Sequence, residues 1–224
     1  MLAISYFENV MRIPDEFVTA TLETIYMTVL TCLIAFILGI IVGIILVLTQ
    51  PNGLKENRIF YSILDKIVNI FRSIPFVIMM ALLVNVTRGI VGTSIGTTAA
   101  IVPLVFATVP FYARQIQNAL VEVNPGVIEA AEAMGLSTWD IVYRVYLKES
   151  LPAIIRVSAL SIINVIGITA MAGTIGGGGL GNLAITRGYN RFQGDVTLVS
   201  TLIILVLVFI SQAVSDYMMK KVEH

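Results

Sequence analysis

Few residues in this chain could carry out chemistry on their own. Histidine occurs once, as His224 at the C-terminus, and cysteine occurs once, as Cys32 within an apolar run. The chain therefore lacks the His-centred acid–base groups, metal ligands and catalytic triads of a typical intramembrane hydrolase. Cys32 has no intrachain disulfide partner, so we expect it to pack as a small apolar side chain. These observations predict that the chain is not an enzyme.

A run of glycines resembles a phosphate-binding loop. Gly176, Gly178 and Gly181 match the pattern G-x-G-x-x-G. That pattern binds a dinucleotide only between a strand and a helix of a βαβ unit, and the surrounding sequence predicts no strand. A turn that ends an apolar segment is the better interpretation. The ATP-binding pattern G-x-x-x-x-G-K-[ST] is absent from the sequence, so we do not expect ATP hydrolysis by a P-loop in this chain.

A polar and mostly acidic stretch, EAAEAMGLSTWDIVYRVYLKESLP, occupies residues 129–152. Its local signals predict a first helix over residues 125–134, because Pro125 suits the first turn of a helix. Gly135 permits the left-handed conformation that ends a helix. The stretch is therefore expected to begin as a short helix that stops at a glycine.

A second helix is predicted after this glycine. Ser137 can cap its N-terminus, and Asp140 stands three residues later in the capping-box position. Its apolar residues, which predict an adhesive face for a soluble partner, are Ile141, Val142, Val145 and Tyr146. The interpretation is a rigid helix–turn–helix that docks a partner; a purely structural amphipathic loop is the alternative.

Nucleic acid is not the expected partner of this stretch. The spacing of Ala131, Gly135 and Ile141 is typical of a DNA-binding helix-turn-helix. However, the acidic residues of the stretch outnumber its basic ones and would repel phosphate. They are Glu129, Glu132, Asp140 and Glu149, against Arg144 and Lys148.

The elements that hold this loop are membrane helices. The chain is 57% hydrophobic and 12% charged, whereas soluble domains contain about 25% charged residues. Residues 25–48 carry no charge, and about 20 apolar residues suffice to cross a bilayer. We predict five membrane spans, at about residues 21–49, 63–86, 97–115, 153–175 and 196–218. The chain is expected to be an all-α membrane protein with a single transmembrane domain over residues 1–224.

Lysine and arginine residues predict the orientation, because they are enriched in cytoplasmic loops. With the N-terminus outside, the cytoplasmic residues are Lys55, Arg58, Lys66, Arg114, Arg144, Lys148, Arg156, Lys220 and Lys221. The external residues are then Arg12, Arg88, Arg187 and Arg191. The opposite orientation would invert this bias. We therefore expect the C-terminus and the polar stretch in the cytoplasm.

An ion-coupled carrier is an alternative function. Such carriers usually place a carboxylate in mid-membrane. Here Glu23, Asp65 and Asp216 lie near the ends of predicted spans and are interpreted as interfacial residues. This alternative is weakly supported.

The polar stretch resembles the EAA loop of permease subunits of ABC importers, through Glu129, Ala130 and Ala131 followed by Gly135. Further strings resemble the permease of the methionine importer. They are NIFRSIPF at 69–76, IVGTSIG at 90–96, PFYAR at 110–114 and GGGGLGNLAITRGYNRF at 176–192.

This resemblance implies a fold like that of type I ABC importers, with a coupling loop at about residues 119–152. It implies that Glu129, Ala130, Ala131 and Gly135 contact an ATPase. It also makes Ala170, Met171 and Gly173 candidates for the solute path or its gate. The pattern departs from the family at Lys148, where proline is usual, so we expect the second helix to continue for another turn.

The resemblance also implies the partners. They are a second copy of the chain, two cytoplasmic ATPase subunits that bind ATP and Mg²⁺, an extracytoplasmic methionine-binding protein and membrane lipid. No cofactor is expected on this chain itself. The expected function is passage of L-methionine, and of D-methionine or derivatives, across the cytoplasmic membrane. Another amino acid or small solute is the alternative substrate.

Overall fold

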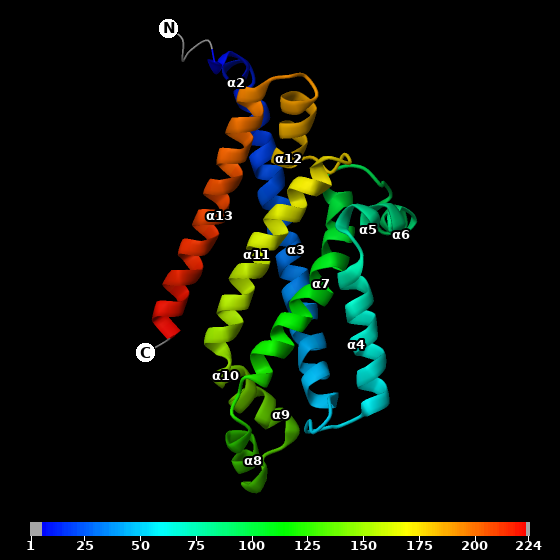
Figure 1. Cartoon of the computed structure of the whole chain (residues 1–224), viewed down its shortest axis with the longest axis vertical. Coiled ribbons are helices and arrows are strands. Elements are labelled where there is room, and N and C mark those ends of the chain that lie inside the picture. The colour runs from blue at the N-terminus through cyan, green and yellow to red at the C-terminus, as the bar shows by residue number, and fades with distance from the viewer. Residues whose placement is uncertain (1–5, 223–224) are drawn as a thin grey trace. The chain divides into compact units, whose positions relative to one another are not determined.

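The computed structural model describes residues 6–222, which form helices and turns with no strand in that range (Figure 1). His224 lies outside the described residues. The helices before the polar stretch are α2 (Glu8–Arg12), α3 (Pro14–Thr49), α4 (Arg58–Ser73), α5 (Phe76–Leu82), α6 (Val84–Val91) and α7 (Thr97–Val121). Those that follow are α8 (Pro125–Ala133), α9 (Thr138–Ile141), the π-helical η1 (Val142–Tyr146), α10 (Leu147–Glu149), α11 (Leu151–Gly173), α12 (Gly179–Leu183), the π-helical η2 (Ala184–Tyr189) and α13 (Gly194–Val222). The all-α fold class is confirmed.

Four helices among the described residues are long and apolar enough to cross a membrane: α3, α7, α11 and α13. They correspond to the predicted spans at 21–49, 97–115, 153–175 and 196–218. Of these, α3 begins earlier than predicted and α7 ends later. Helices can extend beyond the hydrocarbon layer, so apolar composition locates the span better than it locates the helix ends.

The second predicted span, at 63–86, is not one continuous helix. It is divided among α4, α5 and α6, and the first break lies at Ile74 and Pro75. A proline lacks an N–H and disfavours helical geometry in the residue before it, so α4 ends before Ile74. Pro75 itself has an extended ψ of 137° and precedes α5. The count of five spanning helices is therefore not confirmed.

The chain divides into two compact units, and each long helix contributes residues to both of them. Among residues 6–222, unit 1 comprises residues 6–33, 74–107 and 162–212, and unit 2 comprises residues 34–73, 108–161 and 213–222. The four long helices α3, α7, α11 and α13 each pass from one unit to the other.

Unit 1 fixes the glycine-rich turn through the first long helix. The Glu23 carboxylate accepts a hydrogen bond from the Gly179 N–H at 2.6 Å, and the Thr24 hydroxyl accepts one from the Leu180 N–H at 2.9 Å. Apolar packing reinforces these bonds, because Leu180 and Leu183 of α12 form a buried cluster with Phe17 of α3. Glu23, predicted as an interfacial carboxylate, thus satisfies one backbone donor at the start of α12, and Thr24 satisfies the next.

Unit 2 contains the larger buried cluster, which joins α3, α7, α8, α9 and η1. Its members are Val47, Leu48, Tyr112, Ile116, Leu120, Val123, Ala131, Ile141, Val142, Val145 and Tyr146. Gly43 permits close approach of α3 to α7, because an added Cβ would lie 2.6 Å from a side-chain atom of Ile116. Burial of this apolar surface is the main stabilising contribution within the unit.

A polar cluster ties α4 to α7 within unit 2. The Arg114 guanidinium lies 2.5 Å from the Asp65 carboxylate and donates a second hydrogen bond to Gln117 Oε1 at 2.6 Å. Gln117, which is buried, in turn donates to Gln50 and to the Tyr61 hydroxyl. Asp65, predicted as interfacial, is therefore paired with an arginine.

Candidate functional site

The first candidate site is the helical loop between α7 and α11, in unit 2. Its first helix, α8, begins as its sequence predicts: Pro125 occupies the first turn and Asn124 is the N-cap. The Asn124 side chain accepts a hydrogen bond from the Gly126 N–H at 2.8 Å. An asparagine cap satisfies a backbone donor that the helix itself cannot bond, so α8 has a fixed starting point.

The end of α8 is a Schellman motif centred on Gly135. This glycine has a φ of +81°. The Gly135 N–H bonds the Glu132 carbonyl at 2.9 Å, and the Leu136 N–H bonds the Ala131 carbonyl at 3.2 Å. These are the two backbone bonds that define the motif. The predicted left-handed cap is confirmed.

The second helical stretch begins with the predicted cap. The Ser137 hydroxyl accepts a hydrogen bond from the Asp140 N–H at 3.2 Å and donates one to the Asp140 carboxylate at 2.6 Å. The bond from Ser137 is the main reason why the pKa of Asp140 lies below its ordinary value, and nearby Arg144 adds to this effect. Helical turns continue through Lys148 but end at Glu149, with Ser150 as the C-cap. The helix therefore passes Lys148 by one residue and not by the whole turn that was predicted.

The apolar face predicted to bind a partner is instead part of the core. Its residues Ile141, Val142, Val145 and Tyr146 are at most 8% exposed. They pack in the unit 2 cluster with residues of α3 and α7. The prediction that these side chains form an adhesive face is therefore wrong, because the long helices of the same chain already bury them.

The outward surface of the loop carries other apolar side chains. Met134, Trp139 and Tyr143 are 72%, 62% and 63% exposed. The Trp139 and Tyr143 rings lie side by side, with centroids 6.4 Å apart. Exposed aromatic residues are common anchors of protein interfaces. Sequence reasoning missed these three residues.

The predicted ATPase-contacting residues divide between surface and core. Glu129, Ala130 and Gly135 are exposed, whereas Ala131 is 2% exposed and packs in the unit 2 cluster. Ala131 thus contributes to the packing of α8 against the core.

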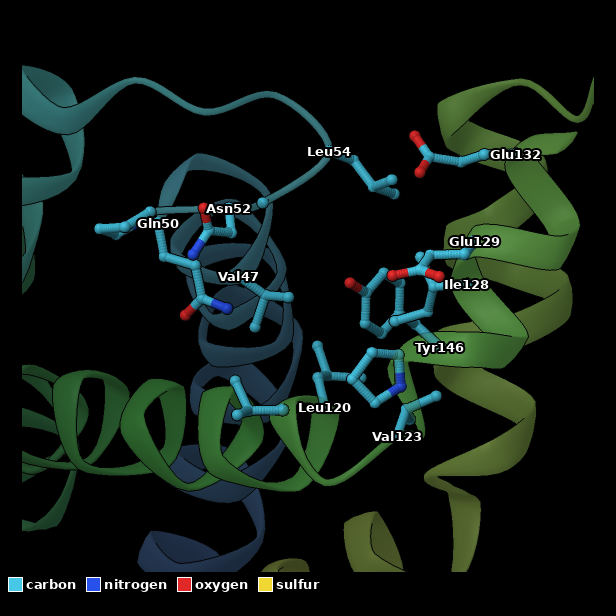
Figure 2. A pocket seen from close by; sticks show the side chains of 14 residues that line it. Val47, Gln50, Asn52, Leu54, Leu120, Val123, Ile128, Glu129, Glu132 and Tyr146 are labelled. Atoms are coloured by element: carbon cyan, nitrogen blue, oxygen red, sulfur yellow. The ribbon is translucent and has the colours of Figure 1, made fainter.

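A cavity of about 430 Å³ lies between α8 and the loop that follows α3 (Figure 2). Glu129 and Glu132 project from the α8 side, Asn52 and Leu54 come from the opposite wall, and Tyr146 lies between them (Figure 2). Among residues 6–222, neither glutamate has a hydrogen-bond or ion-pair partner. Burial raises the pKa of Tyr146, and the charge of Glu132 adds to that rise. The rim of this cavity is therefore suited to a positively charged group.

The opposite wall is a tight turn. Asn52 has a φ of +63°, and an added Cβ on Gly53 would lie 2.6 Å from the Leu48 carbonyl oxygen. The Glu56 carboxylate accepts a hydrogen bond from the Asn52 N–H and pairs with Arg58, and both interactions lower the pKa of Glu56. The wall is thus a rigid partner surface for α8.

The second candidate region is the end of α11, in unit 1. Met171 is 50% exposed. Ala170 and Gly173 contact α12: an added Cβ on Gly173 would lie 2.3 Å from the Asn182 nitrogen, and one on Gly181 would lie 2.2 Å from the Ala170 carbonyl oxygen. Gly173 therefore permits close helix packing, and its part in a gate stays a prediction.

Most of the chain matches a known family of membrane transport proteins. Residues 35–224 match the family described as "Binding-protein-dependent transport system inner membrane component". This chain belongs to that family. It is accordingly a membrane transport component rather than an enzyme.

Two curated relatives of this transport family are similar over almost their full length. The probable D-methionine transport system permease protein MetI of Haemophilus influenzae is 48% identical over 206 residues, covering 92% of this chain and 97% of the relative. The methionine import system permease protein MetP of Bacillus subtilis is 46% identical over 211 residues, covering 94% of both chains.

Solved structures of transport proteins share the fold. A chain of the MetNI methionine ABC transporter, in inward-facing conformations, has a TM-score of 0.90 and 39% identity, covering 92% of this chain and 96% of that one. A chain of an amino acid ABC transporter solved with histidines has a TM-score of 0.79 at 16% identity, which shows similarity of fold alone. The chain therefore has the permease fold of type I ABC importers.

Proposed function

We propose that this chain is the permease subunit of an ATP-driven importer that passes methionine through the cytoplasmic membrane. The observation that carries the proposal is the near-complete coverage, at 46% and 48% identity, of relatives named as methionine permeases. The solved relative with a TM-score of 0.90 is a methionine ABC transporter. Passage of another amino acid or small solute is the alternative.

The proposal includes a homodimer with the solute path on its two-fold axis. One copy has too few long helices to enclose a solute path by itself. A symmetric pair of copies would surround the path from two sides. Two ATPase subunits would bind ATP and Mg²⁺. An extracytoplasmic protein would deliver methionine to the opposite side of the membrane. These partners are proposed from the family and from the names of the relatives.

We propose that α8 is the coupling helix that seats against an ATPase subunit. Glu129 and Ala130 are exposed on it, and Gly135 ends it with a fixed direction. The exposed Met134 and Trp139 would extend this contact. Unpaired carboxylates beside the cavity favour a basic groove on the partner.

The distribution of basic residues supports an external N-terminus and a cytoplasmic C-terminus. Of the 14 lysine and arginine residues, all but Arg12, Arg88, Arg187 and Arg191 belong to unit 2, which carries the coupling loop. Cytoplasmic segments are enriched in these residues. An odd number of crossings is then required, so we propose that the broken segment of α4, α5 and α6 supplies the fifth crossing.

Of the three residues predicted at the gate, Met171 is the one whose side chain is exposed and free to contact a solute. It is half exposed at the last turn of α11, whereas Gly173 is engaged by α12. A flexible, apolar methionine side chain can close a narrow path without a fixed geometry. We propose that Met171 contributes to the gate.

Charge reversal on α8 tests the coupling proposal. We expect Glu129→Arg to lower methionine uptake by about tenfold or more, because a reversed charge at an interface costs several kcal/mol. ATP hydrolysis by the co-expressed ATPase would continue without transport. Uptake and ATP hydrolysis are measured in proteoliposomes that contain the whole transporter.

The matched control is Glu122→Arg, which reverses another exposed carboxylate of the same loop outside α8. We expect this variant to transport as the unaltered protein does. Normal uptake by Glu129→Arg, at a normal amount of protein in the membrane, would overturn the assignment of α8 as the coupling helix.

A further inference from the structure

Helix α11 has one exposed face in unit 1 with an unusual composition. Asn164, Gly167 and Met171 are exposed and follow one another at helical spacing, so they lie on the same side of the helix. Val165 and Thr169, on the other side, are buried. The helix is thus packed against its own chain on one side and open on the other.

The side chain of Asn164 has unmet hydrogen-bonding capacity. An asparagine amide offers two donor hydrogens and an acceptor oxygen. No interaction partner of this amide is found among residues 6–222. By contrast, the Thr169 hydroxyl of the same helix donates to the Ile166 carbonyl at 2.7 Å. An unpaired amide is unfavourable in contact with lipid chains, so this face of α11 is not suited to lipid.

The exposed face of α13 in the same unit shows what a lipid-facing surface looks like. Between residues 198 and 210 its exposed large side chains are all apolar: Leu198, Leu202, Leu205, Val206, Phe209 and Ile210. The exposed Thr201 hydroxyl in this range donates to the Thr197 carbonyl at 2.8 Å, and the exposed amide of Gln212 comes only after this apolar surface. Such a surface is stable in hydrocarbon without any partner. The contrast indicates that the two helices present their open faces to different surroundings.

Tight pairing with another helix does not explain the α11 face either. Close helix pairs in membranes need small residues at successive turns. Gly167 is small, and an added Cβ there would meet no atom within 4 Å. The next exposed residues along the face in the two directions, Asn164 and Met171, are large. The face therefore combines open space, a free amide and a flexible apolar side chain.

We infer that this face lines the solute path and that Asn164 forms hydrogen bonds with the amino acid in transit. The inference rests on the proposed function. A zwitterionic amino acid carries an ammonium group and a carboxylate, and a neutral amide can accept from the first and donate to the second. Met171 supplies an apolar contact for a flexible thioether side chain.

Thiol accessibility tests whether water reaches this face. The chain has a single cysteine, Cys32, which is buried, so Cys32→Ser gives a background without thiols. The Asn164→Cys variant in that background is co-expressed with the ATPase, and membrane vesicles are prepared. These vesicles are treated with a charged, membrane-impermeant methanethiosulfonate. Phe209→Cys on α13 is the lipid-facing control, and the exposed loop position Asn190→Cys is the positive control.

We expect Asn164→Cys to react at least about tenfold faster than Phe209→Cys, because thiolates form in water and not in lipid. Reaction as slow as that of Phe209→Cys would overturn the inference. Formation of a disulfide between two copies without any labelling would also overturn it, because the face would then be a buried contact between chains.

Transport separates this inference from the proposed function. We expect Asn164→Leu to lower methionine uptake by about tenfold, the effect of losing one or two hydrogen bonds to charged groups, and Phe209→Leu to leave uptake unchanged. If the unaltered transporter imports no methionine but Asn164→Cys is labelled, the solute path stands and the substrate is wrong. If the transporter imports methionine and Asn164→Cys is not labelled, the role of Asn164 alone fails.

Discussion

Gly135 fixes the direction in which the chain leaves α8. Its φ is +81° and an added Cβ would meet no atom within 4 Å, so only backbone strain opposes a larger residue. We expect Gly135→Ala to destabilise the protein by about 1–2 kcal/mol, seen as a lower thermal unfolding midpoint in detergent. Gly89→Ala is the matched control, because Gly89 also has open space but lies within helix α6 at ordinary φ. A larger loss for Gly89→Ala would contradict this account.

The Ser137 cap predicts a dependence on pH. Because the hydrogen bond from Ser137 lowers the pKa of Asp140, the cap stabilises the loop above the unfolded-state pKa of the carboxyl. That contribution is lost as pH falls through the lower folded-state pKa. We expect Ser137→Ala to raise the pKa of Asp140 toward its ordinary value, as measured by the ¹³C shift of its carboxyl. An unchanged titration would show that the bond does not form in solution.

Residue-level signals in this chain could be predicted because they act locally. A proline at the first turn, a glycine after the last and a serine before a helix each satisfy neighbouring backbone groups. Pro125, Gly135 and Ser137 are therefore where the sequence predicts them. Asn164 could not be found in this way, because its importance depends on which side of α11 the rest of the chain covers.

At the scale of elements, the stretch from α9 to α10 packs against the core of unit 2 with one side, and its other side is exposed. Ile141 is 1% exposed, and Trp139, two residues before it, is 62% exposed. We expect Ile141→Ala to cost about 2–5 kcal/mol, as is usual for a buried aliphatic residue. Trp139→Ala should cost less than about 1 kcal/mol in the isolated chain. Thermal unfolding of the two variants measures the difference, and the reverse order would contradict the assignment of the core.

Sequence reasoning chose the wrong side of this stretch for an identifiable reason. Apolar residues lie on both sides of this stretch: Trp139 and Tyr143 on one side, and Ile141 and Val145 on the other. Their pattern alone therefore does not show which side is buried. The side that packs is decided by Val47 and Ile116, which are distant in sequence. The predicted span at 63–86 ignored the break at Pro75 for a similar reason, because apolar residues continue past this proline while the helix does not.

At the scale of the whole molecule, composition and apolar runs predicted a membrane protein correctly. Loop motifs predicted the transport family correctly. Methionine was expected as the substrate from strings that resemble the methionine permease, because no residue pattern identifies a methionine site. The proposal that this chain passes methionine is supported by relatives of that name, which are nearly half identical over almost their whole length. The five crossings stay a prediction, since four helices among residues 6–222 suit a bilayer by length and composition.

Uptake of radiolabelled L-methionine at submicromolar concentration tests the central claim most directly. Cells that contain this gene are compared with cells from which it has been deleted, and with deleted cells that carry it again on a plasmid. We expect high-affinity uptake to disappear on deletion and to return with the gene. Uptake that is unchanged by deletion, in cells without another methionine importer, would contradict the proposal that this permease carries methionine.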